Sequence, residues 1–439
     1  MVVMSVLGSL AAGARIPVFG ADGIGSREAM LQVRLSPELD LLDTPSAANV
    51  LIVVGDMPPS MEDVLGRVHD AMSHPRCTVV GPQSTGRMPD WPFVHRCDSQ
   101  DLVATIAATH AGLLAGRITS DPPVLPDVDP APWRGVGPYG QGGSGMTGGT
   151  PYGRPMAELR PDRDGLRLDA LPLRIGPFFA PLPTSLVMDV TFAGDVVVEA
   201  AVAPNPLAGI TDGARARRGL RPFLRALVEP VPVATLEVAR ARDHLTWTAD
   251  ALQAHELPAL AQRALRLAAT VQPGDGRLVT RFARLLEWTQ VLRWSTADVG
   301  HLDTAQLAGL GLGPVSRAAG LAEDLRAEDP AYQRLGFEPL VGTGADAAAR
   351  WRLRLAEAAQ SLDLAARASN FDTTPTGRVE SPRGRLEADS APGVRLLTLV
   401  PELLSGLEWG DAVAALVSLD LDPEETALAS RPVAGEEAA

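Results

Sequence analysis

The segment NVLIVVG, residues 49–55, decides the fold of the first part of the chain. Its five central residues are all apolar and lead directly into a glycine. Such an uninterrupted run is typical of a strand that is buried on both faces. A second run of this kind, CTVVG, occupies residues 77–81. Because short strands and helical periodicity alternate around these runs, residues 1–118 are predicted to form an α/β domain with a doubly wound parallel sheet.

The other elements predicted for this domain are a strand at residues 15–20 and helices at residues 26–35, 60–72 and 99–112. The sequence GADGIG lies between the first strand and the first helix. Its glycines could let a helix N-terminus bind a pyrophosphate, with Asp40 or Asp43 facing a ribose. The candidate cofactor-binding residues are Gly20, Gly23 and Gly25. Because the spacing is not a strict GxGxxG, a tight turn between strand and helix is the alternative.

Composition divides the rest of the chain. Residues 119–155 are so rich in Gly and Pro that they are predicted to be a linker, and residues 156–439 to form a second domain. Strands at 185–192 and 195–202 predict a hairpin near the start of that domain. Helical periodicity predicts a mainly α, long-helix bundle, followed by a strand-like piece, a last helix and an acidic tail. The predicted bundle helices are 235–255, 257–271, 277–294 and 345–368, the strand-like piece is 394–400, and the last helix is 408–419.

Composition also excludes several kinds of chemistry. The net charge is −14 and the chain has no lysine, so all 39 basic residues are arginine. A lysine Schiff base and a Walker A lysine are therefore excluded, and nucleic acid is not expected as a partner. Two cysteines, Cys77 and Cys97, cannot supply a four-cysteine cluster or zinc site; two reduced buried thiols are favoured over one disulfide. No membrane span and no signal peptide are predicted.

Isolated polar residues give weaker signals. The seven histidines have no compact ligand spacing, so no metal site is predicted; they are His69, His74, His95, His110, His244, His255 and His301. His244 follows Asp243 and could serve in acid–base chemistry, although a packed helix histidine is the alternative. Ser84 could be a nucleophile or a loop serine. A basic run could face an acidic partner or lipid phosphate, or be a solvated face. It comprises Arg215, Arg217, Arg218, Arg221 and Arg225.

Ordered motifs over about 260 residues of the second half resemble the 49 kDa, D-type subunit of NADH–quinone oxidoreductase (respiratory complex I), a family related to the large subunit of nickel–iron hydrogenases. They include a Gly-Pro opening, a long helix with an Arg-His-Trp pattern, GLGPVSRAAGLAEDLR (residues 311–326), the stretch 329–362 that closes with QSL, and Pro-Arg-Gly. Their positions include Gly176, Pro177, Arg242, His244, Pro314, Arg350, Arg354, Glu357, Pro382, Arg383 and Gly384. The resemblance implies structural roles for these residues.

Residues 49–55 and 61–76 resemble a strand and a helix of the neighbouring B-type small subunit, which binds the terminal iron–sulfur cluster. The chain therefore resembles a fusion of two adjacent subunits. It departs from both families in its metal ligands. The small-subunit cluster loop is here Gly81-Pro82-Gln83-Ser84, residues 21–25 replace the early cysteine pair, and the hydrogenase CxxC pairs are missing. The complex I region that contributes to the quinone pocket is replaced around residues 204–209.

These departures favour a redox-silent scaffold at the electron-input position of a complex I-like or hydrogenase-like assembly, peripheral on the cytoplasmic face of the membrane. Its partners would be complex I-like subunits, including antiporter-like membrane subunits. No catalytic residue and no cofactor bound by this chain are predicted; quinone and NADH are implied by the resemblance alone. One alternative is an active NADH–quinone oxidoreductase subunit with redox centres on partner chains. Another is a nucleotide-binding oxidoreductase that uses the glycine turn.

Overall fold

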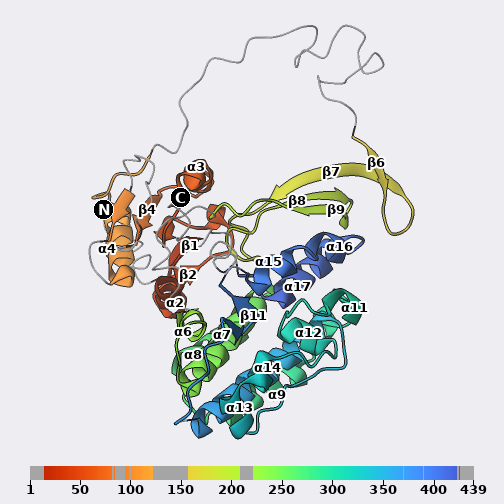
Figure 1. Ribbon diagram of the computed structural model, residues 1–439. Coiled ribbons are helices and arrows are strands. Elements are labelled where there is room, and N and C mark those ends of the chain that lie inside the picture. The colour runs from red at the N-terminus through yellow and green to blue at the C-terminus, as the bar shows by residue number, and fades with distance from the viewer. Residues whose placement is uncertain are drawn as a thin grey trace, which may run out of the picture.

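The architecture comes from a computed structural model, which describes residues 14–81, 84, 94–97, 101–121, 157–207, 221–368, 370–388, 390–422 and 425. Figure 1 shows a sheet region built from the first part of the chain, an antiparallel β-meander, and a helical region below them. From residue 122 onward the predicted linker lies outside the described residues.

The first sheet is parallel throughout, with the strand order β2-β1-β3-β4-β5. Its strands are β1 (Ile16–Asp22), β2 (Leu39–Leu41), β3 (Val50–Val54), β4 (Cys77–Val80) and β5 (Val94–Arg96). Every residue of β3 is buried. Leu51 and Val53 face the cluster that includes Met61 and Leu65, whereas Ile52 faces the opposite cluster. Helices therefore cover both faces, as the apolar runs predict. The edge strands β2 and β5 were not predicted, because each has only three residues, one or two of them polar or charged.

Three helices flank this sheet. They are α2 (Arg27–Leu35) and α4 (Leu102–Leu114) on one face, and α3 (Glu62–Asp70) on the other. All three match predicted helices to within a few residues. A short antiparallel bridge between Ile24 and Asp56 joins the loops after β1 and β3. In a sheet of this order, those loops border the point at which a ligand crevice usually opens.

The second sheet is an antiparallel meander that covers the helical region. It comprises β6 (Leu159–Pro161), β7 (Arg167–Ile175), β8 (Met188–Ala193) and β9 (Val196–Val202), in that order. Strands β8 and β9 confirm the predicted hairpin. Met188, Val190 and Phe192 alternate along β8 and are buried in the main hydrophobic core. The long β6–β7 hairpin extends away from the body of the molecule (Figure 1).

The helical region is centred on α7 (Val233–Ala254) and α14 (Ala347–Arg367), which pack against each other, with α8 (Pro258–Thr270) and α9 (Gly276–Thr289) beside them. These helices confirm the long-helix prediction for the second half. The shorter helices are α6 (Arg221–Ala226), α10 (Val291–Thr296), α11 (Thr304–Leu307), α12 (Pro314–Ala318), α13 (Pro330–Arg334), α15 (Pro392–Leu397), α16 (Val400–Leu404) and α17 (Trp409–Leu419). A two-stranded ribbon pairs β10 (Arg378–Ser381) with β11 (Gly384–Glu387).

Two predictions for this region were wrong. The single helix expected at residues 277–294 is two helices, because Gln290 adopts a left-handed conformation with φ of 57° between α9 and α10. The strand expected at residues 394–400 is instead divided between α15 and α16. Each of these helices has a proline in its first turn, where a missing N–H costs nothing and the fixed φ favours a helix.

The sheet region is joined to the rest of the molecule by side chains from both directions. Phe178 and Leu207 pack into the core beneath α3, while Leu31 and Leu35 of α2 pack against the main helical core. The Gln262 side chain of α8 donates a hydrogen bond of 2.7 Å to the Arg34 carbonyl. Across the part of the chain that the structure describes, no helix is both long enough and apolar enough to span a bilayer.

Candidate functional site

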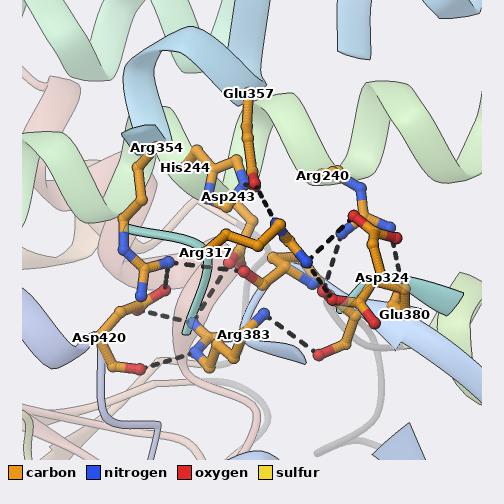
Figure 2. A network of polar contacts seen from close by, with 12 residues as sticks. Arg240, Asp243, His244, Arg317, Asp324, Arg354, Glu357, Glu380, Arg383 and Asp420 are labelled. Atoms are coloured by element: carbon orange, nitrogen blue, oxygen red, sulfur yellow. Dashed lines mark hydrogen bonds and ion pairs between the residues drawn. The ribbon is translucent and has the colours of Figure 1, made fainter. Parts of the chain in front are cut away.

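Helices α7 and α14 bury charged side chains where they face each other. Glu237, Arg240 and His244 are spaced by three and four residues on α7, so they share one face, and Arg350, Arg354 and Glu357 share a face of α14 in the same way. All six side chains are at most 1% exposed. Arg350 is bound by Ser418 and two carbonyl groups, whereas the other five join a larger network of charges (Figure 2).

We refer to this set as the buried ion network. It contains six arginines and eight carboxyl groups from distant segments of the chain. Its members are Arg27, Arg240, Arg317, Arg326, Arg354, Arg383, Glu237, Asp243, Asp324, Glu357, Glu380, Asp420, Asp422 and Glu425, with His244 and Tyr332 as neutral partners.

Arg317 is at the centre of the network. Pro314 begins α12, and Arg317 follows one turn later with no exposed surface. Its Nε donates to Glu357 at 2.7 Å, and its Nη1 lies 2.8 Å from a Glu380 oxygen and 3.0 Å from an Asp324 oxygen. One guanidinium thus binds three carboxyl groups that come from α14, β10 and the loop after α12 (Figure 2).

A second group of contacts surrounds Glu237. Tyr332 donates its hydroxyl hydrogen to Glu237 at 2.7 Å, and Arg326 Nη1 donates to the other oxygen at 3.2 Å. Arg326 also makes a two-pronged contact with Asp324, at 3.0 and 2.7 Å. Arg240 donates to the backbone carbonyls of Glu380 and Ser381, which fixes the β10–β11 turn against α7.

The third group of contacts links the Pro-Arg-Gly turn to the last helix and to the sheet region. Arg383 and Arg354 both bind Asp420, just after α17, at 3.2 and 2.9 Å. Arg383 also lies 3.3 Å from Asp243, whose other oxygen accepts a 2.7 Å hydrogen bond from Arg27 of α2. The network therefore crosses from the helical core into the sheet region.

Glycine holds the Pro-Arg-Gly turn in place. Gly384 has a φ of 134°, and a Cβ there would lie 2.3 Å from the Gly311 carbonyl oxygen. Only glycine permits this close approach of two backbones. Gly176 plays a similar part before β8, because a Cβ there would lie 2.0 Å from the Leu186 oxygen. Gly176 and Gly384 therefore have backbone-shaping roles, whereas the structural roles of Pro177 and Pro382 stay predictions.

Burial and charge oppose each other throughout the network. Burial would raise the pKa of Glu357, but Arg317 overcomes it and holds that pKa well below its usual range. Burial lowers the pKa of His244 to about 4, so this imidazole is neutral near pH 7 and its Nε2 lies 3.3 Å from Glu357. Some of the carboxyl groups hold protons more tightly than usual. Burial raises the pKa of Asp420 to about 6 and that of Glu425 to about 8.

The structure brings together only some of the residues nominated from the sequence. His244, Arg354, Glu357 and Arg383 lie in the network, and Pro314 positions Arg317. Arg242 shares α7 with His244 but is exposed, and its guanidinium donates to the Val271 carbonyl at 3.3 Å. The sequence motifs did not single out Glu237, Arg240 and Asp420. Charged residues at three- and four-residue spacing within apolar helix faces were the signal for the first two.

The glycine turn after β1 has its own backbone contacts. The Gly23 N–H donates to the Val54 carbonyl at 2.7 Å, and a Cβ at Gly23 would lie 2.5 Å from the Asp56 oxygen. Gly20 lies inside β1 beneath Met30, and Gly25 has a φ of 80°. The close packing of two loops thus accounts for Gly23, as in the tight-turn alternative. Nucleotide binding at this turn stays a prediction.

The remaining candidates are dispersed. Ser84 donates its hydroxyl hydrogen to the Val53 carbonyl at 3.3 Å. Cys77 and Cys97 are buried and not joined in a disulfide. Among the described residues, no three His, Cys, Asp or Glu side chains are grouped to hold a metal ion. Arg225 pairs with Glu229. Arg215, Arg217 and Arg218 lie outside the described residues, as does the Arg221 side chain.

Comparison with known proteins points to one class. Residues 260–389, which include Arg317, Arg354, Glu357 and Arg383, match the family described as the 49 Kd subunit of respiratory-chain NADH dehydrogenase. This part of the chain is therefore similar to the D-type subunits of complex I.

Individual relatives agree, and each is a D-type subunit of NADH-quinone oxidoreductase. The chain is 46% identical over 80 residues to the relative from Saccharopolyspora erythraea, covering 18% of this chain and 17% of that protein. It is 35% identical over 114 residues to the relative from Frankia alni, covering 25% and 24%. The relative from Mycobacterium marinum is 35% identical over 83 residues, covering 18% and 19%. The matches thus span about a fifth of the length of these relatives.

Proposed function

We propose that this chain is a redox-silent structural subunit of a complex I-like assembly. It would take the electron-input position of a membrane-associated complex, on the cytoplasmic face. Its partners would be other complex I-like subunits, including antiporter-like membrane subunits. The similarity of residues 260–389 to the 49 kDa family supports the assembly. The chemistry of the buried ion network supports the structural role.

The observation that carries this proposal is the ion bridge between the sheet region and the helical core. Arg27, just after the glycine turn, reaches Asp243, and Arg383 contacts the same carboxylate. The resemblance implies an iron–sulfur cluster near this turn. Guanidinium and carboxylate groups do not transfer electrons as a cluster would. Their paired hydrogen bonds can instead hold the sheet region and the helical core in a fixed orientation.

The number and the burial of the cysteines also support a redox-silent role. The whole sequence has two cysteines, and a four-thiolate cluster needs four. Burial raises the pKa of Cys77 to about 12, which keeps it a thiol rather than a metal-binding thiolate. Both cysteines contribute instead to the apolar core between the sheet and α4.

The test is affinity purification of the tagged full-length chain from detergent-solubilised native membranes, with mass spectrometry of the proteins recovered. Co-purification with antiporter-like and other complex I-like subunits is expected. The chain should then be separated anaerobically from its partners and assayed for iron, acid-labile sulfide and electron paramagnetic resonance signals. Iron far below one cluster per chain is expected.

Three outcomes would overturn the proposal. Recovery of the chain without membrane-complex subunits would remove the assembly. A stoichiometric cluster in the separated chain would remove the redox-silent role and favour an active NADH–quinone oxidoreductase subunit. Iron on partner chains together with quinone reduction that is lost on mutation of this chain's loop at residues 204–207 would also favour that alternative.

A further inference from the structure

Two tryptophans near the junction of α9 and α10 are almost fully exposed. The side chains of Trp288 and Trp294 are 81% and 87% exposed, and Val291 between them is also exposed. By contrast, Trp247 and Trp351 are buried in the core. Large aromatic side chains lose much hydrophobic free energy when left in water. A surface that displays two of them only six residues apart is therefore expected to be covered by a partner.

Arginines continue this exposed surface along α9. Arg277, Arg281 and Arg284 are exposed, and their spacing of four and three residues places them on the same helix face as Trp288. We call Arg277, Arg281, Arg284, Trp288, Val291 and Trp294 the tryptophan–arginine face. Within the described residues, none of its three arginines makes an ion pair. The neighbouring carboxylate, Glu287, is held by Arg352 of α14 at 2.9 Å.

The charge of this region is opposite to that of the whole chain. Residues 258–296 contain six arginines and two carboxylates, although the chain as a whole has a net charge of −14. The neighbouring helix α14 does not reverse this local charge, since it adds the exposed Arg352 as well as Asp363, whose carboxylate lies beside Gly276 at the start of α9. Asp275 and Asp298 lie beyond the two ends of the face. A covering partner should therefore be anionic.

The tryptophans of this face project from the surface and do not line a hollow, which favours a fluid bilayer surface as the partner. A cavity of about 30 Å³ lies between α9, α10 and α14, lined by residues such as Leu286, Leu292 and Trp351. Trp288, Val291 and Trp294 do not line it, so the indoles project outward instead of forming the wall of that hollow. Figure 1 shows α9 in the lower, helical part of the molecule, away from the sheet region.

We propose that the tryptophan–arginine face binds the anionic headgroup surface of a lipid bilayer. Indole rings prefer the boundary between headgroups and acyl chains, and guanidinium groups form paired hydrogen bonds with phosphate oxygens. Neither interaction needs a preformed groove. The isolated chain should therefore bind anionic vesicles, and this inference does not depend on the proposed place in a complex.

The experiment uses the purified full-length chain with vesicles of phosphatidylcholine, alone or mixed with phosphatidylglycerol. Binding to the mixed vesicles, weakened by salt, is expected from co-sedimentation. Brominated lipids should quench tryptophan fluorescence, and this quenching should be lost in the double variant Trp288→Phe, Trp294→Phe. The triple variant Arg277→Gln, Arg281→Gln, Arg284→Gln should bind on the order of 100-fold more weakly, about fivefold for each arginine.

The matched control is the triple variant Arg334→Gln, Arg367→Gln, Arg378→Gln. It changes the net charge equally but alters exposed arginines on α13, α14 and β10, so it should bind like the original chain. Equal loss of binding in both triple variants would overturn the proposal, because binding would then follow net charge. So would absence of binding to mixed vesicles, or indoles that become shielded from solvent only when an acidic protein partner is added. Circular dichroism would verify that each variant is folded.

Discussion

The sheet region and the helical core both bury apolar side chains, but only the helical core also encloses a large set of paired charges. Strand β3 is apolar at all five positions, and every one of them is buried. Helices α7 and α14 instead enclose arginines and carboxylates with almost no exposed surface. An apolar core tolerates exchange of similar side chains, whereas a buried ion set depends on each partner being present. The contrast teaches that apolar packing holds the sheet region, whereas the helical core combines apolar packing with specific ion pairing.

The largest effect is expected from Arg317→Met. The change leaves Asp324, Glu357 and Glu380 without their shared cation in a buried site. Removing one partner of a buried ion pair costs about 3–5 kcal/mol, and here three partners lose their contact. Denaturant unfolding would measure the loss. The matched control is Glu287→Gln, which removes the exposed pair with Arg352 and should cost about 0–1 kcal/mol. If both variants lost the same small amount of unfolding free energy, specific ion pairing would not be a main source of stability in the helical core.

Ile52→Ala tests the other side of the comparison. Ile52 is fully buried in β3, so truncation should cost about 2–5 kcal/mol in the free energy of unfolding. Ile52→Val keeps most of the volume and should cost only about 0.5–1.5 kcal/mol. If both variants lost the same stability, the sheet region would not be held by filled volume.

Arg27→Met should have a smaller effect, concentrated at the junction of the two regions. Arg27 is about half exposed, so loss of its bonds to Asp243 and Asp422 should cost about 1–2 kcal/mol. Hydrogen exchange should speed up in α2 more than in β3. Uniform acceleration over the whole chain would show that the bridge does not act locally. Arg67→Met on exposed α3 is the control for a lost charge in the sheet region.

The pH dependence of stability should isolate Glu425. Its folded pKa of about 8 lies above its ordinary value of 4.5, so the folded chain binds more protons than the unfolded chain between these values. Stability therefore falls as pH rises through this window. His244 has the opposite effect, since its lowered pKa makes the free energy of unfolding rise with pH. This rise is complete above about pH 6.5, because an unfolded histidine titrates near 6.5. A decline of at most about 2 kcal/mol is expected between pH 6.5 and 8.

Glu425→Gln provides the control for this decline. An amide does not titrate, so the variant should keep nearly constant stability between pH 6.5 and 8. Thermal unfolding at several pH values would measure it. The same slope in both proteins would mean that another group causes the decline.

The sequence predicted the elements with local signals and missed those set by distant contacts. Residues 49–55 predicted β3 because a strand buried on both faces needs only apolar side chains. Helical periodicity continued over residues 277–294, and the residue type of Gln290 did not indicate a break in the helix. Leucine and valine at 394–400 suggested a strand, although the two prolines favoured helix starts.

The buried ion network was hardest to predict for the same reason. Arg317 resembles any solvated arginine in a short helix, since its partners lie 7, 40 and 63 positions further along the chain. The resemblance nominated His244, Arg354, Glu357 and Arg383 by motif. It did not indicate that Arg27, from the other end of the chain, approaches the same carboxylate as Arg383. Only the folded arrangement reveals that pairing.

The bridge from Arg27 to Asp243 also links proton affinity to the seating of the sheet region. Arg27 contributes positive charge to a set in which carboxyl groups are in excess. Moving α2 away would remove that charge and strengthen proton binding by the remaining carboxyls. Linkage is reciprocal, so proton uptake by the set must weaken the seating of α2 by the same free energy. The sheet region and the helical core therefore titrate as one unit. Lowering the pH weakens the contact between α2 and the buried ion network, and forming that contact releases protons.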